Sequence, residues 1–250
     1  MSVVTPASSA SSVPLRSWSP RDAFRVRLGA ACLIGASIAE LLGVLFRGPL
    51  ASPGGAPLWF VAVSNSPTLH LGWGLLLSSA MAQCFAWVAL YRWRRDTVDE
   101  GWAFWGTILA VGSIIVFLPV AGALGFTSHE AAIAQEAGQN GAVALVAATA
   151  EGPFARIFLL VSVLTGIAAT ITWSRVLWRV PQLASWVVPL YVLHTVTQSI
   201  TSPMFAPWGY RLERLGAVAM LLVAVSIATR IWRDTASGPA GTSRTDLTQS

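Results

Sequence analysis

The sequence predicts an all-α fold, a polytopic membrane helix bundle of six transmembrane helices with both termini in the cytoplasm. The chain of 250 residues is 54% hydrophobic and only 11% charged, with a mean hydropathy of +0.63, whereas soluble domains carry roughly 25% charged residues. Its apolar residues form six long runs, each near the ~20 residues that a helix needs to cross a bilayer. Arginines are unequally divided between the two ends of these runs.

The first apolar run follows a long basic segment, so we interpret it as a retained signal anchor and not as a cleaved signal peptide. The second run begins at Ser66 and Pro67, residue types that favour the N-cap and the first helical position. None of the runs shows the period-2 alternation of a membrane β-strand. The six predicted spans are Leu28–Phe46, Pro67–Leu90, Trp102–Phe126, Ile157–Trp178, Ala184–Phe205 and Leu215–Trp232.

The third connection, Thr127–Arg156, is long for a helix bundle. Thr127 and Glu130 have the spacing of a capping box, and Gly138 would end a short helix that begins there. Ala142–Ala150 is predicted as a second short helix on the membrane surface. This connection is therefore expected to cover or to close the outer end of the bundle.

Arginine placement predicts the orientation. Twelve of the sixteen arginines flank one set of helix ends, and four flank the other. Since arginine favours cytoplasmic loops, the richer side, which holds both termini, is predicted to be cytoplasmic. The four outer arginines are Arg47, Arg156, Arg211 and Arg214.

Composition divides the chain into three parts. Residues 1–26 and 234–250 are rich in Ser, Pro, Ala, Gly and Thr and are predicted to be disordered cytoplasmic segments. Residues 27–233 form the predicted six-helix transmembrane domain. Neither terminal segment combines basic patches with base-stacking aromatic residues, so a nucleic-acid partner is not expected and the lipid bilayer is the principal predicted partner.

Most of the twelve tryptophans lie near the ends of predicted spans, as in an interfacial aromatic belt. A different role, the lining of a pocket for a cation, applies at most to Trp73, Trp87 and Trp173. The tryptophans assigned to the belt are Trp59, Trp93, Trp102, Trp105, Trp178, Trp186, Trp208 and Trp232.

Glu40 is the acidic residue inside a predicted span. A charged group at membrane depth costs roughly 3 kcal/mol or more, so such residues face a partner or a wet cavity and often mark a functional site. An alternative is a structural anchor, in which Glu40 accepts hydrogen bonds from hydroxyls such as those of Ser37, Thr107 and Ser113. Both alternatives remain open from the residues alone.

The fifth predicted span carries a polar stripe. Tyr191, His194, Gln198 and Thr201 recur at spacings of three, four and three, which places them on one face of a helix. Pro189 is expected to kink the helix one turn before His194. The stripe therefore faces the bundle interior or serves as contact between helices.

Depth brings the two features together. At about 1.5 Å per residue, His194 lies roughly 15 Å and Glu40 roughly 18 Å from the cytoplasmic starts of their spans. His70, in the first turn of the second span, competes as a partner from the outer side. We favour His194 slightly over His70.

Motifs for established chemistries are lacking: the chain has no HExxH, GxSxG or P-loop, and no acid pair spaced for a di-metal site. A bis-histidine haem is disfavoured because His70 and His194 lie at different depths and His129 lies in a predicted loop. We therefore predict neither a metal nor a cofactor.

Three resemblances bear on function. Tyr191-Val192-Leu193-His194-Thr195 resembles a stretch in a late helix of membrane acyltransferases of the OafA type. An intramembrane acid among tryptophans resembles membrane-bound terpene cyclases, which carry a second acid in a late helix; the predicted span Leu215–Trp232 has none.

The whole chain is similar to small six-span bacterial integral membrane proteins, of the actinobacterial type, grouped under domains of unknown function. The shared features are the basic N-terminus, the long third connection and the Arg/Pro-marked link Ser174–Pro181. This similarity implies a location in the bacterial inner or plasma membrane.

Two functions follow as hypotheses. The leading one is the binding, movement or sensing of a small or lipophilic molecule at a polar site comprising Glu40, His70, His194, Gln198 and Thr201. The alternative is a membrane enzyme, terpene-cyclase-like or acyltransferase-like, in which Glu40 is the general acid and His194 or Tyr191 assists. A third possibility is a structural or regulatory subunit.

Overall fold

The computed structural model describes residues 18–47, 67–139, 141–142, 144–146, 152–201 and 207–236. Within these ranges the chain is helical apart from short turns and contains no strand, which confirms the predicted all-α fold. The helices are α1 (Pro20–Arg47), α3 (Pro67–Arg94), α4 (Glu100–Glu136), α6 (Pro153–Trp178), α7 (Val187–Thr201) and α8 (Pro207–Ala236).

Five of these helices, α1, α3, α4, α6 and α8, are long and apolar enough to cross a membrane. They indicate a multi-pass membrane protein. Helix α7 has 15 residues, which reach about 22 Å at 1.5 Å per residue, less than the roughly 30 Å of a hydrocarbon core. The predicted span Ala184–Phe205 is therefore longer than the helix observed, and residues 202–206 lie outside the described ranges.

The first and the last helix of the chain, α1 and α8, extend past the predicted transmembrane domain. Ser19 caps α1, because its hydroxyl accepts a hydrogen bond from the Asp22 amide at 3.1 Å and donates one to the Asp22 carboxylate at 2.7 Å. Residues 20–26 and 234–236, which we predicted to be disordered, are thus helical. Residues 1–17 and 237–250 of the predicted disordered segments lie outside the described residues.

Helix α4 contradicts the predicted outer connection. It continues to Glu136 without a break at Phe126, and the Thr127 hydroxyl donates to the carbonyl of Ala123 at 2.6 Å instead of capping a new helix. The capping-box pattern was therefore overridden by continuation of the helix, which also makes His129 helical. The helix ends where predicted, since Gly138 adopts a φ of +83°.

Pro189 does not kink a helix. Because α7 begins at Val187, Pro189 lies in the first turn, where its missing N–H would have no intrahelical partner in any case. The predicted kink is therefore wrong. The amide of Leu190 bonds to the carbonyl of Trp186 at 3.1 Å, so the helix is regular from its start.

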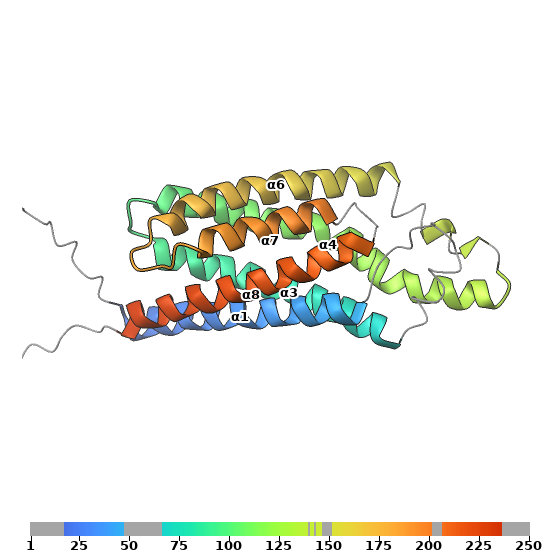
Figure 1. Cartoon of the computed structure of the whole chain (residues 1–250), viewed down its shortest axis with the longest axis horizontal. Coiled ribbons are helices and arrows are strands. Elements are labelled where there is room, and N and C mark those ends of the chain that lie inside the picture. The colour runs from blue at the N-terminus through green and yellow to red at the C-terminus, as the bar shows by residue number, and fades with distance from the viewer. Residues whose placement is uncertain are drawn as a thin grey trace, which may run out of the picture.

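The six helices form a closed ring. Around the ring, α1 packs on α3, α3 on α4, α4 on α6, α6 on α7, α7 on α8, and α8 again on α1. Figure 1 shows the helices running lengthwise together, with the start of α1 and the end of α8 at one end and the last turns of α4 projecting at the other. At the shared end, Arg27 Nε donates to Thr235 Oγ1 at 2.8 Å.

The core is divided along the bundle axis. The larger cluster closes the end that holds the start of α1 and the end of α8, where Val26, Leu90, Val176 and Ile231 are almost fully buried. A smaller cluster around Trp73 lies toward the opposite end. The interior between the two clusters contains the polar residues of the candidate site.

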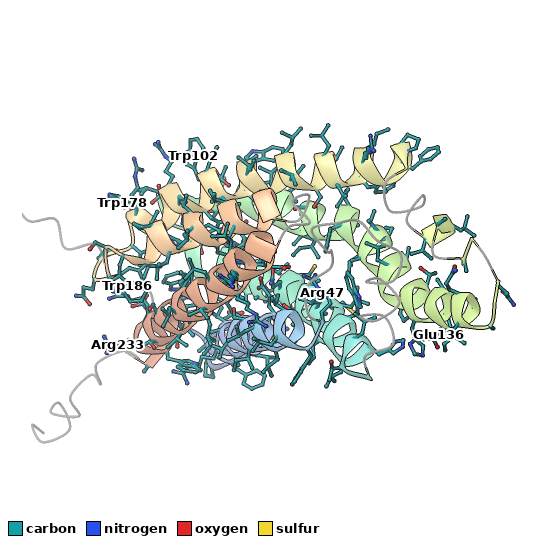
Figure 2. All side chains as sticks on the ribbon, turned by 45° about the vertical axis from the view of Figure 1, so that its right-hand side comes forward. Arg47, Trp102, Glu136, Trp178, Trp186 and Arg233 are labelled. Carbon is teal, nitrogen blue, oxygen red and sulfur yellow. The ribbon has the colours of Figure 1, made fainter. Side chains whose placement is uncertain are left out.

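The exterior is apolar along the helices and rich in tryptophan near one end. Trp102, Trp178 and Trp186 are exposed and lie with Arg233 near one end of the bundle in Figure 2, whereas Arg47 and Glu136 lie toward the other. This arrangement agrees with an aromatic belt. Trp93 departs from it, because its side chain is buried and its Nε1 donates to Asp234 at 3.1 Å. Trp59 and the Trp208 side chain lie outside the described residues.

Candidate functional site

Glu40 points from α1 into the interior of the ring. Its side chain is almost fully buried, and its carboxylate accepts hydrogen bonds from two amide side chains on other helices. Gln198 Nε2 on α7 donates to Oε1 at 2.8 Å, and Gln83 Nε2 on α3 donates to Oε2 at 3.3 Å. A carboxylate at this depth is therefore held by neutral donors from both sides of the ring.

His194 lies beside this carboxylate. Its Nδ1 is 3.7 Å from Glu40 Oε1 and 3.2 Å from the carbonyl oxygen of Gly216 on α8. Because a carbonyl oxygen only accepts, Nδ1 carries a proton in this arrangement. The predicted meeting of Glu40 and His194 is thus observed, with the stronger contact of the ring made to Gly216.

The polar stripe of α7 faces inward, as the spacing predicted. Tyr191 is buried against Trp87, with ring centroids 6.0 Å apart, and His194 and Gln198 contact Glu40. Thr201 is the last residue of α7, and its side chain lies outside the described part of the structure.

His70 is not part of this cluster. Its ring is exposed and meets His129 of α4 edge-on, with centroids 4.3 Å apart. The two histidines lie toward the end of the bundle opposite the start of α1 and the end of α8. The predicted competition between His70 and His194 is therefore decided in favour of His194.

The hydroxyls that we considered as anchors for Glu40 bind elsewhere. Ser37 donates to the carbonyl of Leu33 at 2.9 Å, and Thr107 to that of Ala103 at 2.8 Å. Ser113 donates to the carbonyl of Ser162 on α6 at 2.8 Å. They join backbone groups within a helix or between α4 and α6, so the anchors of Glu40 are the two glutamines.

Two adjoining cavities open beside Glu40, and together we call them the chamber. One is about 180 Å³ and includes Glu40 in its wall; the other is about 210 Å³ and includes Tyr191. Five residues line both cavities: Gln83, Ile114, Phe117, His194 and Gln198. The chamber therefore lies within the ring, between the two core clusters.

The walls of the chamber combine polar and apolar groups. Glu40, Gln83 and Gln198 provide polar surface, whereas Ile114 and Phe117, which line both cavities, provide apolar and aromatic surface. A few convergent polar groups in a mostly apolar cavity are typical of sites for small organic molecules.

An ion pair that the sequence did not indicate lies at the edge of the chamber. Arg47 Nη2, at the end of α1, is 2.6 Å from Glu213 Oε2 on α8, and both side chains are largely buried. In the sequence, Arg47 follows the first predicted span and Glu213 precedes the last one. A base and an acid at these two span ends are the feature of the sequence that could have indicated the ion pair.

Glu213 also corrects the comparison with terpene cyclases. Helix α8 begins at Pro207, earlier than the predicted span, so the last long helix does contain an acid on the chamber. Gln83 was missed as well, although Ser79 and Gln83 share one face of α3 and are hydrogen-bonded at 3.3 Å.

No protein-family model, no curated protein and no solved structure matches this chain.

Proposed function

We propose that this chain is a membrane protein that binds a small amphiphilic molecule in the chamber, with the polar group of the ligand at Glu40. The observation that carries the proposal is a buried carboxylate, held by two glutamine amides, in the wall of a cavity inside the ring of helices. Buried acids in membrane helices usually mark ligand or ion pathways because their burial is costly.

The composition of the chamber supports an amphiphilic ligand. Hydrogen-bonding groups converge on Glu40, and apolar side chains form most of the surface of both cavities. A mostly apolar cavity with a few convergent polar groups binds a ligand that has one polar end and an apolar body. Binding, movement and sensing of such a molecule all require that it occupies this site.

A membrane enzyme is the second candidate, favoured by the geometry of His194. With Nδ1 directed at Gly216 and Glu40, the Nε2 edge of the ring is left for the chamber, as in catalytic histidines that a carboxylate orients. Glu40 would then act as general acid, with His194 or Tyr191 assisting. The resemblances to terpene cyclases and acyltransferases stay predictions.

Replacing Glu40 by glutamine tests the main proposal. We expect that a panel of lipophilic amines, alcohols and carboxylic acids includes a compound that stabilises the purified protein in nanodiscs, by about 2.7 kcal/mol at 100 times Kd. Glu40→Gln should remove this stabilisation while the variant stays folded. The measurement is thermal unfolding with and without compound.

Glu136→Gln is the matched control, since it makes the same chemical change at an exposed position of α4. It should respond to compounds as the natural protein does. Stabilisation that survives in Glu40→Gln, or a panel without any stabilising compound, would contradict binding at Glu40.

We further propose six spans with cytoplasmic termini in a bacterial cell membrane. The start of α1 and the end of α8 lie at one end of the ring (Figure 1), which favours an even number of crossings, with α7 added to the five long helices. The excess of arginines at that end supports a cytoplasmic orientation.

Reporter fusions test this topology. Green fluorescent protein fused to either terminus should fluoresce, and alkaline phosphatase inserted after Gly138 should be active because that segment would lie outside. Alkaline phosphatase is also fused to each terminus, where it should be inactive. Activity at both termini would overturn the orientation, and activity at one terminus alone would overturn the six spans.

A further inference from the structure

The charges around the chamber do not balance among themselves. Five titratable side chains lie in its walls: Glu40, Arg47, Tyr191, His194 and Glu213. Arg47 is committed to Glu213, at 2.6 Å, and its guanidinium also lies over the ring of Trp73 at 5.3 Å. This pair is neutral overall, so the arginine is not the counter-ion of Glu40.

Glu40 is left with incomplete compensation. Its hydrogen-bond donors, Gln83 and Gln198, are uncharged. His194 is 3.7 Å away and directs Nδ1 to the carbonyl of Gly216 at the shorter distance of 3.2 Å. Since an ionised carboxylate at this depth is costly without a positive partner, a cation that enters the chamber gains attraction from it.

The geometry of the two amides favours the same kind of ligand. Gln83 and Gln198 each use Nε2 as donor to Glu40 and both line the chamber, so each amide also brings a carbonyl oxygen, an acceptor, to the neighbourhood of the carboxylate. A group with several N–H donors, such as an ammonium, matches a carboxylate flanked by two acceptors. A group that only accepts has no such match there.

Aromatic side chains complete the site. Trp87, Phe117 and Tyr191 line the chamber, and Trp87 and Tyr191 pack with ring centroids 6.0 Å apart. Aromatic faces attract cations and also provide apolar surface for an organic body. Trp87 and Trp173 both belong to the main core cluster, but of the two only Trp87 also lines the chamber.

We propose that the ligand of the chamber is a monovalent organic cation, a protonated amine with a compact apolar body. Its ammonium contacts Glu40 and the carbonyl oxygens of Gln83 and Gln198, and its body packs on Trp87 and Phe117. This inference rests on the proposed function and adds the charge class of the ligand.

Two probes of nearly equal shape test the charge class: 1-adamantylamine, which is protonated at pH 7, and 1-adamantanol, which is neutral. Binding is measured by calorimetry on the full-length protein in nanodiscs of zwitterionic lipid, so that lipid charge does not concentrate the amine. Since hydrogen bonds to charged groups are stronger than neutral ones, the amine should bind about tenfold tighter than the alcohol, a difference of about 1.4 kcal/mol.

Three variants accompany the probes. Glu40→Gln should abolish the preference for the amine, Glu40→Asp should retain it because the charge is kept, and Glu136→Gln should leave it unchanged. Glu40→Asp also preserves a test if Glu40→Gln fails to fold, as judged by gel filtration and circular dichroism.

The outcomes separate this inference from the proposed function. Equal affinity for both probes in the natural protein overturns the cation while leaving a chamber that binds small molecules. A preference for the amine that survives in Glu40→Gln also overturns it. Failure of both probes to bind contradicts the proposed function itself.

Discussion

Replacing Glu213 by glutamine is expected to lower the free energy of unfolding by about 3–5 kcal/mol, because it leaves Arg47 as a buried and uncompensated charge. The two side chains are 2.6 Å apart, and their exposed fractions are only 7% and 14%. The measurement is unfolding of the purified protein in mixed detergent micelles. The complementary variant, Arg47→Met, should lower the free energy of unfolding by a similar amount, since it leaves the Glu213 carboxylate buried without a positive partner.

The double variant Arg47→Met/Glu213→Leu is the decisive companion. Replacing both charges by apolar groups removes the unpaired charge, so most of the lost stability should return. A double variant whose loss equals the sum of the two single losses would show that the residues act independently. Glu136→Gln, at an exposed position, should change stability little.

Adding one methyl group at Gly72 should also be strongly destabilising. A Cβ atom there would lie 2.6 Å from Cα and 2.9 Å from Cβ of Arg47, so α1 and α3 must separate where Arg47 is held. Overpacking of this kind costs about 1–3 kcal/mol, and more when backbone must move. Gly72→Ala should therefore lower the free energy of unfolding and also displace the Arg47–Glu213 pair.

Gly74→Ala is the matched control on the same helix. A Cβ atom at Gly74 has no neighbour within 4 Å, so this substitution should stabilise α3 by roughly 0.5–1 kcal/mol through the better helix propensity of alanine. Both variants are compared by unfolding in mixed micelles. Changes of the same sign and size would mean that the contact of Gly72 with Arg47 does not restrain the helices.

The substitutions at Gly72 and at Glu213 both act on the surroundings of Arg47. Gly72 sets the approach of α1 to α3, and Glu213 brings α8 to the same arginine. Because Arg47 and Glu213 line the chamber together with Glu40, we expect both substitutions to weaken ligand binding as well as folding. Gly74→Ala should leave ligand binding intact.

The sequence predicted some residues of the candidate site and missed others. Glu40 stood out because a carboxylate in an apolar run is costly, and the inward face of α7 followed from the spacing of Tyr191, His194 and Gln198. Gln83 was missed because a single amide in a helix has no distinctive pattern. The Arg47–Glu213 pair was missed because both residues lie at predicted helix ends, where charges are ordinary.

Local signals failed where tertiary packing or chain continuity overrode them. The capping-box spacing of Thr127 and Glu130 predicted a new helix, but α4 continues through both residues. Pro189 has no bending effect because α7 starts two residues before it, and a start is hard to place when polar and apolar residues mix at a helix boundary.

By itself, the sequence determined that the described chain is helical and that most of its helices are apolar enough to cross a membrane. Long apolar runs with few charges can satisfy their backbone in lipid only as helices. The spacing of Tyr191, His194 and Gln198 places them on one face of α7. Only the tertiary structure decided which groups meet at Glu40. Its partners come from α3 and α7, 43 and 158 residues away in the chain, and contacts at such separations depend on how the ring of helices closes, which no local pattern encodes.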